Sequence, residues 1–370
     1  MKITDSFFKK KLEIQKFNKY PITYGAAFRD IRNRLNYKLR AASNAYYRNK
    51  LSQVAGDSKK TWKVLNEVMG RGTSGHRVEG LLVADQMVND HQIISDSLNK
   101  HFAEVGQSIS GNLPNSPSSF LNYMPNLTPE NQFYLKPLDM TTLRDILSSL
   151  KSSAPGYDEI PLYLYASNFD LLGEVLLYLV NRSLTESVFP ASLKIARVVP
   201  IHKKGSRSDA GNYRPVSVLP SLSKIIEKIV CLQLFEYFTV NKILTNSQFG
   251  FRPNNSTEKA ANNMLEYIYG AITNKEFCLG VYLDLTKAFD TIDREILLRK
   301  LSRYGVSDSS CQWFKSYLSH RLQYVCVNGV NSSKRSINTG IVQGSTSIAV
   351  HYLRQRFSQR FTYSEILFIR

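Results

Sequence analysis

Apolar side chains recur at helical spacing in several stretches of the chain, and these stretches predict most of its helices. In residues 26–52 apolar positions repeat every three to four residues, while arginine and lysine fill the other faces, which predicts a long basic helix. Shorter helices are predicted on the same ground over residues 59–69, 140–149, 170–187, 221–238, 256–274, 292–304 and 311–319.

Runs rich in β-branched and apolar residues predict three short strands, over residues 195–201, 277–285 and 323–327. The second run is apolar almost throughout, which is typical of a strand buried on both faces. The dipeptide Asn328-Gly329 after the third run is a hairpin signal. Because strands and helices do not alternate strictly, the sequence predicts an α+β fold.

Charge and turn residues indicate the domain organisation. Residues 1–63 contain sixteen Lys and Arg against four Asp and Glu, a net charge of +12, and such an arm binds a phosphate backbone without reading sequence. Residues 112–129, rich in Pro, Ser and Asn, indicate a linker and a domain boundary. We therefore expect a basic helical linker segment and a mixed connecting region before the chemistry-bearing domain. The predicted divisions are residues 1–70, 71–135, 136–345 and an atypical tail at 346–370.

The overall composition narrows the class of partner. Lys and Arg outnumber Asp and Glu by 48 to 30, which gives +18 and favours polyanions, nucleic acid ahead of an anionic membrane. The alternative is a soluble basic protein without such a partner. No apolar run approaches the roughly 18 residues of a membrane span, and the start lacks a signal core. We expect an intracellular, soluble protein whose oligomeric state the sequence leaves open.

Cysteine and histidine spacing argues against two further classes of site. The four cysteines form no CxxC pair, and the six histidines show no ligand spacing. The sequence therefore predicts reduced thiols in the core, and neither a disulfide framework nor a zinc site.

One aspartate, Asp284, occupies a position in the sequence that suits a metal ligand. The predicted strand at residues 277–285 delivers Asp284 near its end, before a predicted helix. A hard cation such as Mg²⁺ prefers oxygen ligands, and an aspartate at a strand end presents one rigidly. Taken alone, an aspartate in this position is more often a helix cap or a turn residue.

Eight blocks in fixed order, over roughly residues 135–345, make the chain similar to the reverse transcriptases of LINE-type (non-LTR) retrotransposons of the jockey kind. Residues 279–293 resemble the first catalytic motif of that family. The other similar blocks are residues 152–161, 197–205, 212–217, 248–253, 313–318, 327–329 and 340–345. In the last block Val342 stands where proline is usual. The N-terminal segment also resembles the basic linker that joins endonuclease to polymerase in jockey-like elements.

The resemblance implies the fingers and part of the palm of a right-hand polymerase, acting as an RNA-directed DNA polymerase. Its implied partners are an RNA template, a DNA primer and deoxynucleoside triphosphates, and the parent element would act in the nucleus and cytoplasm. Two divalent ions, Mg²⁺ or Mn²⁺, would support nucleotidyl transfer. Asp284 would bind both ions, with the Leu285 carbonyl as an extra ligand.

The resemblance also implies three basic residues at the triphosphate: Lys203, Lys204 and Arg214. Lysine supplies a mobile point charge, and arginine supplies a planar fork for paired oxygens. Which lysine is the family's equivalent stays open. Read without the neighbouring blocks, the three residues are more simply a solvated basic hairpin.

Three further residues are implied at the incoming nucleotide. Phe289 occupies the position of a steric gate, whose ring would clash with a 2′-hydroxyl; its alternative role is a core phenylalanine. Gln343 and Gly344 would lie beside the nucleotide, since glycine permits close backbone approach and glutamine offers a donor and an acceptor. Without the neighbouring blocks they would be an ordinary turn.

The block at residues 248–253 is implied in the template path through Gly250, Phe251 and Arg252. The alternative for them is a turn with one packed aromatic ring. Asp290 and Asp293 are interpreted as helix-start residues favoured by the helix dipole, not as metal ligands.

The family pattern stops after Ser345. A second carboxylate pair, normally in an aromatic-Ala-Asp-Asp hairpin, does not occur, and residues 346–370 contain one acid, Glu365, and no aspartate. We therefore expect this chain to be inactive as it stands, whether through a frameshift or splice error, a truncated gene model or decay of the element. We also expect the strand before Asp284 to be an open, apolar, aggregation-prone edge.

Two other readings remain. The first is a non-catalytic nucleic-acid-binding remnant, which differs from the polymerase in lacking metal-dependent nucleotide incorporation. The second is a group II intron maturase or a telomerase-like enzyme, which would have a similar palm. The AFD-T-D run at residues 288–293 favours a LINE element instead.

Overall fold

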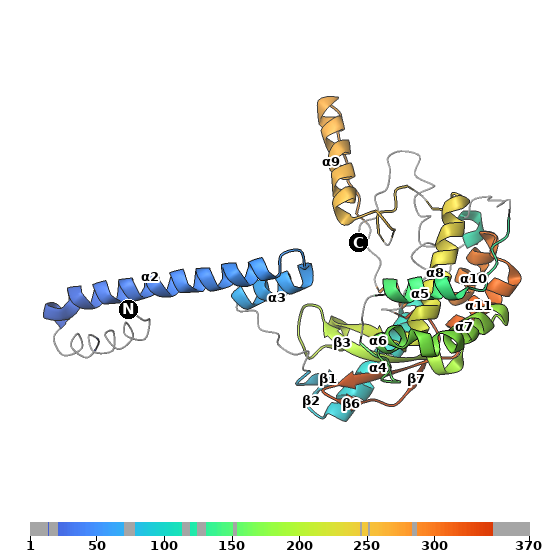
Figure 1. The fold of residues 1–370 in the computed structure, drawn as a ribbon, viewed down its shortest axis with the longest axis horizontal. Coiled ribbons are helices and arrows are strands. Elements are labelled where there is room, and N and C mark those ends of the chain that lie inside the picture. Colours follow the sequence, from blue (N-terminus) through green and yellow to red (C-terminus); the bar gives the residue numbers. More distant parts are fainter. Residues whose placement is uncertain are drawn as a thin grey trace. The chain divides into compact units, whose positions relative to one another are not determined.

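The computed structural model describes residues 14, 21–69, 78–112, 119–123, 131–150, 154–244, 246–250, 252–282 and 287–342 (Figure 1). The chain forms two compact units, residues 1–75 and 76–370.

The first unit is a pair of helices, α2 (Pro21–Gln53) and α3 (Ser58–Val68). The Asp57 side chain caps α3 by accepting a hydrogen bond from the Lys60 amide at 3.0 Å, as an N-cap residue should. Lys50 near the end of α2 pairs with Glu67 of α3 at 2.7 Å. The two helices predicted in this region are confirmed.

The second unit is built around a mixed sheet. Strands β3 (Ile195–His202) and β4 (Tyr213–Val218) form an antiparallel hairpin, and β5 (Arg321–Val327) runs parallel to β3. Strands β6 (Val330–Asn331) and β7 (Arg335–Ile337) both pair antiparallel with β5. The order is β4-β3-β5-β6, with β7 off this path. Together with the helices around it, the sheet gives the mixed helix and sheet content that the sequence indicates.

The turn between β5 and β6 confirms the hairpin signal. Asn328 has φ +50° and Gly329 has φ +87°, the left-handed conformations that a two-residue hairpin turn requires. Such a turn matches the twist of its strands, so the sequence sets this connection locally.

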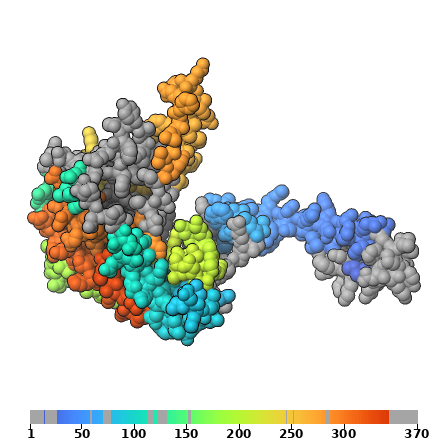
Figure 2. Space-filling view, turned by 180° about the vertical axis from the view of Figure 1, so that it is seen from behind, coloured from blue at the N-terminus to red at the C-terminus, as the bar shows by residue number. Residues whose placement is uncertain are grey.

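Helix α4 (His91–Gly111) packs on the sheet, preceded by the small hairpin of β1 (Leu81–Val83) and β2 (Gln86–Val88). The Leu82 amide donates to the Ser208 carbonyl at 2.7 Å, which ties β1 to the β3–β4 loop. Figure 2 shows the cyan surface of this region beside the lime β3–β4 hairpin. This helix is not among those predicted from the sequence, although buried residues recur in it every four positions: Ile94, Leu98 and Phe102.

Six further helices surround the largest core. They are α5 (Met140–Ser149), α6 (Leu162–Ser167), α7 (Phe169–Thr185), α8 (Ser221–Val240), α10 (Arg294–Arg303) and α11 (Asp308–Leu318). Short 3₁₀ turns are η1 (Phe120–Tyr123), η2 (Ala191–Lys194) and η3 (Ala210–Asn212). All the helices predicted in this part of the chain are confirmed, and α6 is an addition.

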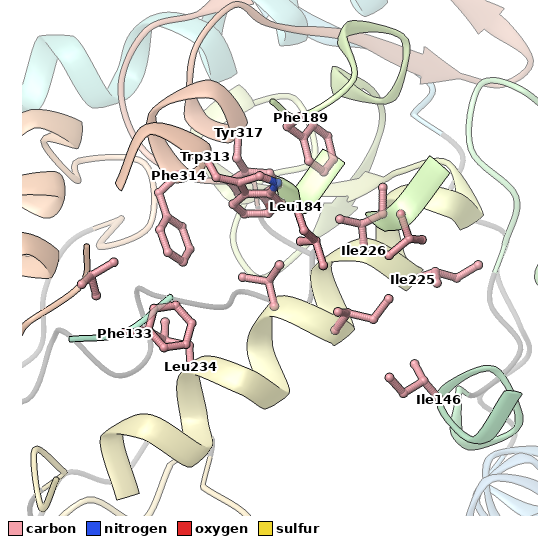
Figure 3. Close-up of a cluster of buried hydrophobic side chains, with 14 of the residues drawn as sticks. Phe133, Ile146, Leu184, Phe189, Ile225, Ile226, Leu234, Trp313, Phe314 and Tyr317 are labelled. Carbon is pink, nitrogen blue, oxygen red and sulfur yellow. The ribbon is translucent and has the colours of Figure 1, made fainter. Parts of the chain in front are cut away.

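Figure 3 shows the aromatic centre of this core, where Phe189 lies against Trp313 and Tyr317. The rings of Trp313 and Tyr317 are stacked, with centroids 5.5 Å apart. The Trp313 indole donates to the Ser183 hydroxyl at 3.1 Å, so its one polar group is satisfied where water is excluded.

The predicted buried strand at residues 277–285 is the main correction. Residues 277–282 form no strand, and Phe277 and Leu279 are 105% and 89% exposed; residues 283–285 lie outside the described part. A strand needs a neighbour for its N–H and C=O groups. Among the described residues none pairs with this run, so its apolar composition alone does not make it a strand.

Helix α9 (Thr257–Thr273), which leads into this run, is confirmed but scarcely packed. Ala260 is its buried residue. Several of its large apolar side chains are exposed: Leu265, Tyr267, Tyr269 and Ile272. With residues 277–282 they form a surface we call the uncovered apolar surface.

Three negative observations hold for the described residues. No helix there is both long and apolar enough to cross a membrane. The four cysteines are all free, as predicted, although Cys278 is exposed and not in the core. No group of three His, Cys, Asp or Glu side chains gathers there as a metal site would require.

Candidate active site

The β3–β4 hairpin presents the three basic residues predicted at the triphosphate. Lys203 and Lys204 follow the end of β3, and the Lys203 amide donates to the Asn212 carbonyl at 2.8 Å. Arg214 lies on β4 opposite Ile201. All three are exposed, and within the described part their side chains make no hydrogen bond or ion pair. Three cations on one hairpin, without internal partners, suit an anionic ligand.

A tight turn follows the segment of Asp284. The amides of Asp290 and Thr291 both donate to the Lys287 carbonyl, at 2.8 and 3.2 Å. Lys287 has φ +46°, a left-handed conformation that costs a non-glycine residue on the order of 1 kcal/mol. The surroundings must therefore hold the turn in place.

The two aspartates after the turn have different roles. Asp293 caps α10, accepting from the amides of Glu295 and Ile296 at 2.8 and 3.0 Å, which confirms its interpretation as a helix-start residue. Asp290 caps no helix, so that interpretation was wrong for it. It is half-buried, and burial raises the pKa of its carboxyl to about 6.

Phe289 is joined by its backbone to the block at residues 340–345. The Ile341 amide donates to the Phe289 carbonyl, and the Gly340 amide to the Ile292 carbonyl, both at 2.9 Å. Gly340 has φ +71°, and a Cβ there would lie 2.6 Å from the Phe289 carbonyl oxygen. Only glycine permits both this conformation and this approach. The Phe289 side chain is buried, at 8% exposed.

Val342 connects the same segment to the base of the hairpin. It is buried in a small cluster with Ala196 of β3 and Leu219, which follows β4. The branched side chain thus fills, by packing, the position where the family usually has proline. Through residues 340–342 the turn with Phe289 and the base of the basic hairpin are brought together.

Arg294 of α10 was not among the predicted site residues, yet it binds the segment of residues 337–340. Its guanidinium donates to the carbonyls of Ile337, Thr339 and Gly340 at 2.8, 3.3 and 2.9 Å. Burial, with Arg321 nearby, lowers the pKa of Arg294 to about 10. No pattern in the sequence marks this role, because the three carbonyls lie more than 40 residues further along the chain.

The loop at residues 154–161 docks beside the hairpin. The Arg197 guanidinium of β3 donates to the Pro155 carbonyl at 3.0 Å, and the Ser221 hydroxyl to the Ile160 carbonyl at 2.7 Å. A Cβ at Gly156 would lie 2.4 Å from the Pro220 nitrogen. Glycine here lets the loop approach the start of α8.

Two of the three residues predicted in the template path lie on a turn before α9. The Gln248 side chain donates to the Gly250 carbonyl at 3.0 Å, and the Asn255 amide to the Arg252 carbonyl at 3.3 Å. A Cβ at Gly250 would meet nothing within 4 Å. Open space around it leaves room for a ligand.

Five predicted site residues lie outside the described part of the chain: Phe251, Asp284, Leu285, Gln343 and Gly344. The first described carboxylates after Asp284 in the sequence are Asp290, which lies in the turn that follows Lys287, and Asp293, which caps α10. One carboxylate and one carbonyl are too few ligands for two divalent ions. Within the described part no three His, Cys, Asp or Glu side chains gather, so that part does not by itself fit the metal pair that the resemblance implies.

Residues 201–361 match the pattern of the reverse transcriptase (RNA-dependent DNA polymerase) family. Over this stretch the chain is similar to RNA-directed DNA polymerases, and the relatives that it resembles are enzymes of non-LTR retrotransposons. It is 32% identical over 214 residues to the RNA-directed DNA polymerase from mobile element jockey of Drosophila melanogaster. It is 32% identical over 222 residues to the probable RNA-directed DNA polymerase from transposon BS of the same species.

A more distant relative supports the same class. The Pol polyprotein of type-1 retrotransposable element R1 of Bradysia coprophila is 27% identical over 213 residues. The matched stretches cover 56% to 57% of this chain but only 21% to 23% of these three relatives. The chain thus spans less than a quarter of their length.

Proposed function

We propose that this chain holds a deoxynucleoside triphosphate against an RNA template and a DNA primer, as the fingers and first catalytic part of a right-hand polymerase. One observation carries the proposal: Ile341 is hydrogen-bonded to Phe289, while Val342 packs on Ala196 and Leu219. The turn of Phe289, residues 340–342 and the base of the basic hairpin therefore meet, and each adjoins residues suited to one part of a nucleotide.

In this arrangement the basic hairpin holds the triphosphate. Lys203, Lys204 and Arg214 supply three exposed positive charges without internal partners in the described part. Arg214 offers paired N–H groups to two oxygens, and each lysine adds a mobile charge. Binding the triphosphate here directs the sugar toward the base of the hairpin.

Phe289 serves as the wall behind the sugar. Its ring is buried and its backbone is held by Ile341, so the wall is fixed. A fixed ring excludes a 2′-hydroxyl by steric clash and selects deoxynucleotides. Gln343 and Gly344 follow Val342 directly and would lie beside the base, while Gly250, Phe251 and Arg252 would guide the template.

The proposed chemistry is nucleotidyl transfer, in which two Mg²⁺ or Mn²⁺ ions activate the primer hydroxyl and neutralise the leaving oxygens. Asp284 and the Leu285 carbonyl would supply part of their ligands. Because that set is too small for two ions, we propose that these 370 residues bind substrate without joining it to a primer. The parent element would act in the nucleus and cytoplasm.

Nucleotide binding tests the proposal directly. The measurement is filter binding of labelled dTTP to the chain with an RNA template annealed to a DNA primer. Replacing Lys203, Lys204 and Arg214 by alanine should weaken binding at least tenfold, since charged hydrogen bonds contribute about 1.5–3 kcal/mol each. Equal binding by the variant and the unaltered chain would refute the proposed role of the hairpin.

The matched control removes the same charge elsewhere in the second unit. Lys242, Arg299 and Lys315 are exposed and have no side-chain partner in the described part. Replacing these three by alanine should change dTTP binding by less than about twofold, as expected for surface charges remote from a ligand. Primer extension with Mg²⁺ or Mn²⁺ tests the proposed lack of polymerase activity. Nucleotide incorporation by the unaltered chain that Asp284→Ala abolishes would refute that proposal.

A second function, non-catalytic binding of nucleic acid, is favoured by the first unit. Helix α2 has many exposed basic residues and one acid, Asp30, which pairs with Arg34. Such a helix suits a phosphate backbone. If the chain binds RNA but no dTTP, this second function stands and the first does not.

A further inference from the structure

Helix α4 precedes in sequence the residues that match the reverse transcriptase family. It nevertheless contacts the sheet, the β3–β4 loop and the turn of Phe289. One of its faces packs into the sheet, where Leu98 and Phe102 share a core with Val198 and Val325. The same helix also contacts η3 in the β3–β4 loop. It therefore spans from the basic hairpin to the strands around β5.

Polar contacts fix the first half of α4 to the segment after β6. Asn99 is fully buried and donates to the Ser333 carbonyl at 2.7 Å, while Gln323 donates to the Asn99 side chain at 3.0 Å. Asp96 accepts from the amide and the hydroxyl of Ser333 at 2.9 and 2.8 Å. Buried, satisfied polar contacts such as those of Asn99 rigidify the elements they join.

The second half of α4 meets the turn of Phe289. The Lys287 ammonium donates to the His101 imidazole, with 3.1 Å between Nζ and Nε2. At Gly106 the helix backbone comes so close that an added Cβ would lie 1.9 Å from the Asp290 carbonyl oxygen and 2.8 Å from the Thr339 hydroxyl. Gly106 is therefore required for this approach.

The turn that α4 touches is the one that needs support. Lys287 is held in a left-handed conformation, and the Phe289 carbonyl accepts the hydrogen bond from Ile341. A shift of the turn would move the Phe289 ring and the segment leading to Gln343 together. The contacts with His101 and Gly106 oppose such a shift from the side of α4.

We propose that α4, through His101 and Gly106, is a positioning element that sets where Phe289 stands and so how sharply the site distinguishes deoxyribose from ribose. The inference rests on the proposed function, because it assumes that Phe289 faces the nucleotide sugar. A merely structural helix would affect the two sugars equally. A positioning helix would change their ratio, since a displacement of about 1 Å is enough to spoil a contact-dependent selection.

The first experiment compares two glycine substitutions on the same helix. Gly106→Ala places a methyl group against the Asp290 carbonyl, whereas Gly111→Ala, the control, meets nothing within 4 Å. The measurement is the ratio of the dissociation constant of UTP to that of dUTP, two nucleotides that differ only in the sugar, for the full chain on the template and primer. We expect Gly106→Ala to lower this ratio about tenfold and Gly111→Ala to leave it unchanged. An unchanged ratio in Gly106→Ala overturns the inference.

A second pair of variants keeps the test decisive if Gly106→Ala does not fold. His101→Leu removes the acceptor for Lys287, whereas His101→Gln keeps an acceptor oxygen at that position. The sugar ratio should fall in His101→Leu and be preserved in His101→Gln. Equal ratios in the two variants overturn the inference.

Hydrogen exchange separates failure of the inference from failure of the proposed function. If the unaltered chain binds neither nucleotide, the proposed function has failed, and the amides of Gly340 and Ile341 become the readout. Their exchange should be faster in His101→Leu than in His101→Gln, because the turn that accepts their hydrogen bonds is loosened. Equal exchange in both variants overturns the inference on structural grounds alone.

Discussion

The hydrogen bond from the Ile341 amide to the Phe289 carbonyl, at 2.9 Å, joins two residues that lie more than fifty positions apart in the sequence. Gly340 beside it makes the close approach of the two backbones possible. Val342, which follows Ile341, is packed on Ala196 and Leu219 at the base of the basic hairpin, so residues 340–342 contact both the turn of Phe289 and the hairpin. These described parts of the candidate site therefore meet in space, although they come from separate parts of the chain.

A buried network under the site gives a prediction about stability. Glu227 is fully buried and accepts hydrogen bonds from the Tyr317 and Ser223 hydroxyls, each at 3.0 Å. Tyr317→Phe removes one of these donors from a buried carboxyl group. We expect the free energy of unfolding to fall by about 1–3 kcal/mol, measured by urea denaturation. Tyr163→Phe, at a position 60% exposed, is the control and should change it by less than about 0.5 kcal/mol.

Asp290 gives a prediction about pH. Its pKa is about 6 in the folded chain against an ordinary value of 3.8, so between these values the folded state binds more protons than the unfolded state. The free energy of unfolding should therefore fall as pH rises from about 4 to 6, by on the order of 2 kcal/mol. Asp290→Asn is neutral at every pH and should be more stable than the unaltered chain at pH 7, but not at pH 3.5.

The control for this measurement is Asp145→Asn, which removes the same charge from an exposed position on α5. Both variants are compared with the unaltered chain by urea denaturation across the pH range. If Asp290→Asn follows the same pH dependence as the unaltered chain, burial of the Asp290 carboxyl does not govern stability.

The uncovered apolar surface predicts poor solubility. Phe277 and Leu279 are almost fully exposed, and contiguous exposed apolar surface promotes association. Replacing both by lysine should raise the soluble yield and lower light scattering, while the thermal midpoint stays unchanged because neither side chain is packed. The control, Asn262→Lys with Asn274→Lys, adds the same charge at exposed polar positions. An equal gain from the control would assign the effect to charge.

The basic helix α2 predicts a salt dependence. Arg29, Arg32 and Arg40 are exposed and carry no partner in the described part. If each neutralises one phosphate of single-stranded RNA, replacing all three by alanine should reduce the slope of log affinity against log salt by about 2. The variant lacking Lys242, Arg299 and Lys315 should keep the original slope. A slope unchanged in the arginine variant would remove α2 from the RNA interface.

Local sequence patterns correctly predicted many of the helices and one turn of this protein. Helical periodicity located α5, α8 and α11 closely, because each has one continuous apolar face whose spacing is a property of the chain itself. Asn328 and Gly329 determined their turn for the same local reason, since few residues adopt left-handed conformations without strain. The order of the reverse transcriptase blocks can also be read directly from the sequence.

Only the tertiary structure decided which of these pieces touch. Residues 277–282 are apolar enough for a strand, yet no described strand pairs with them, and pairing is a property of two segments. Phe289 is buried because Gly340 and Ile341 reach it from another block, and Arg294 acts on carbonyls that no spacing rule connects with it. The closeness of Gly106 to Asp290 is of the same kind. Sequence periodicity reports what each residue prefers, whereas contacts between distant segments depend on how whole elements pack.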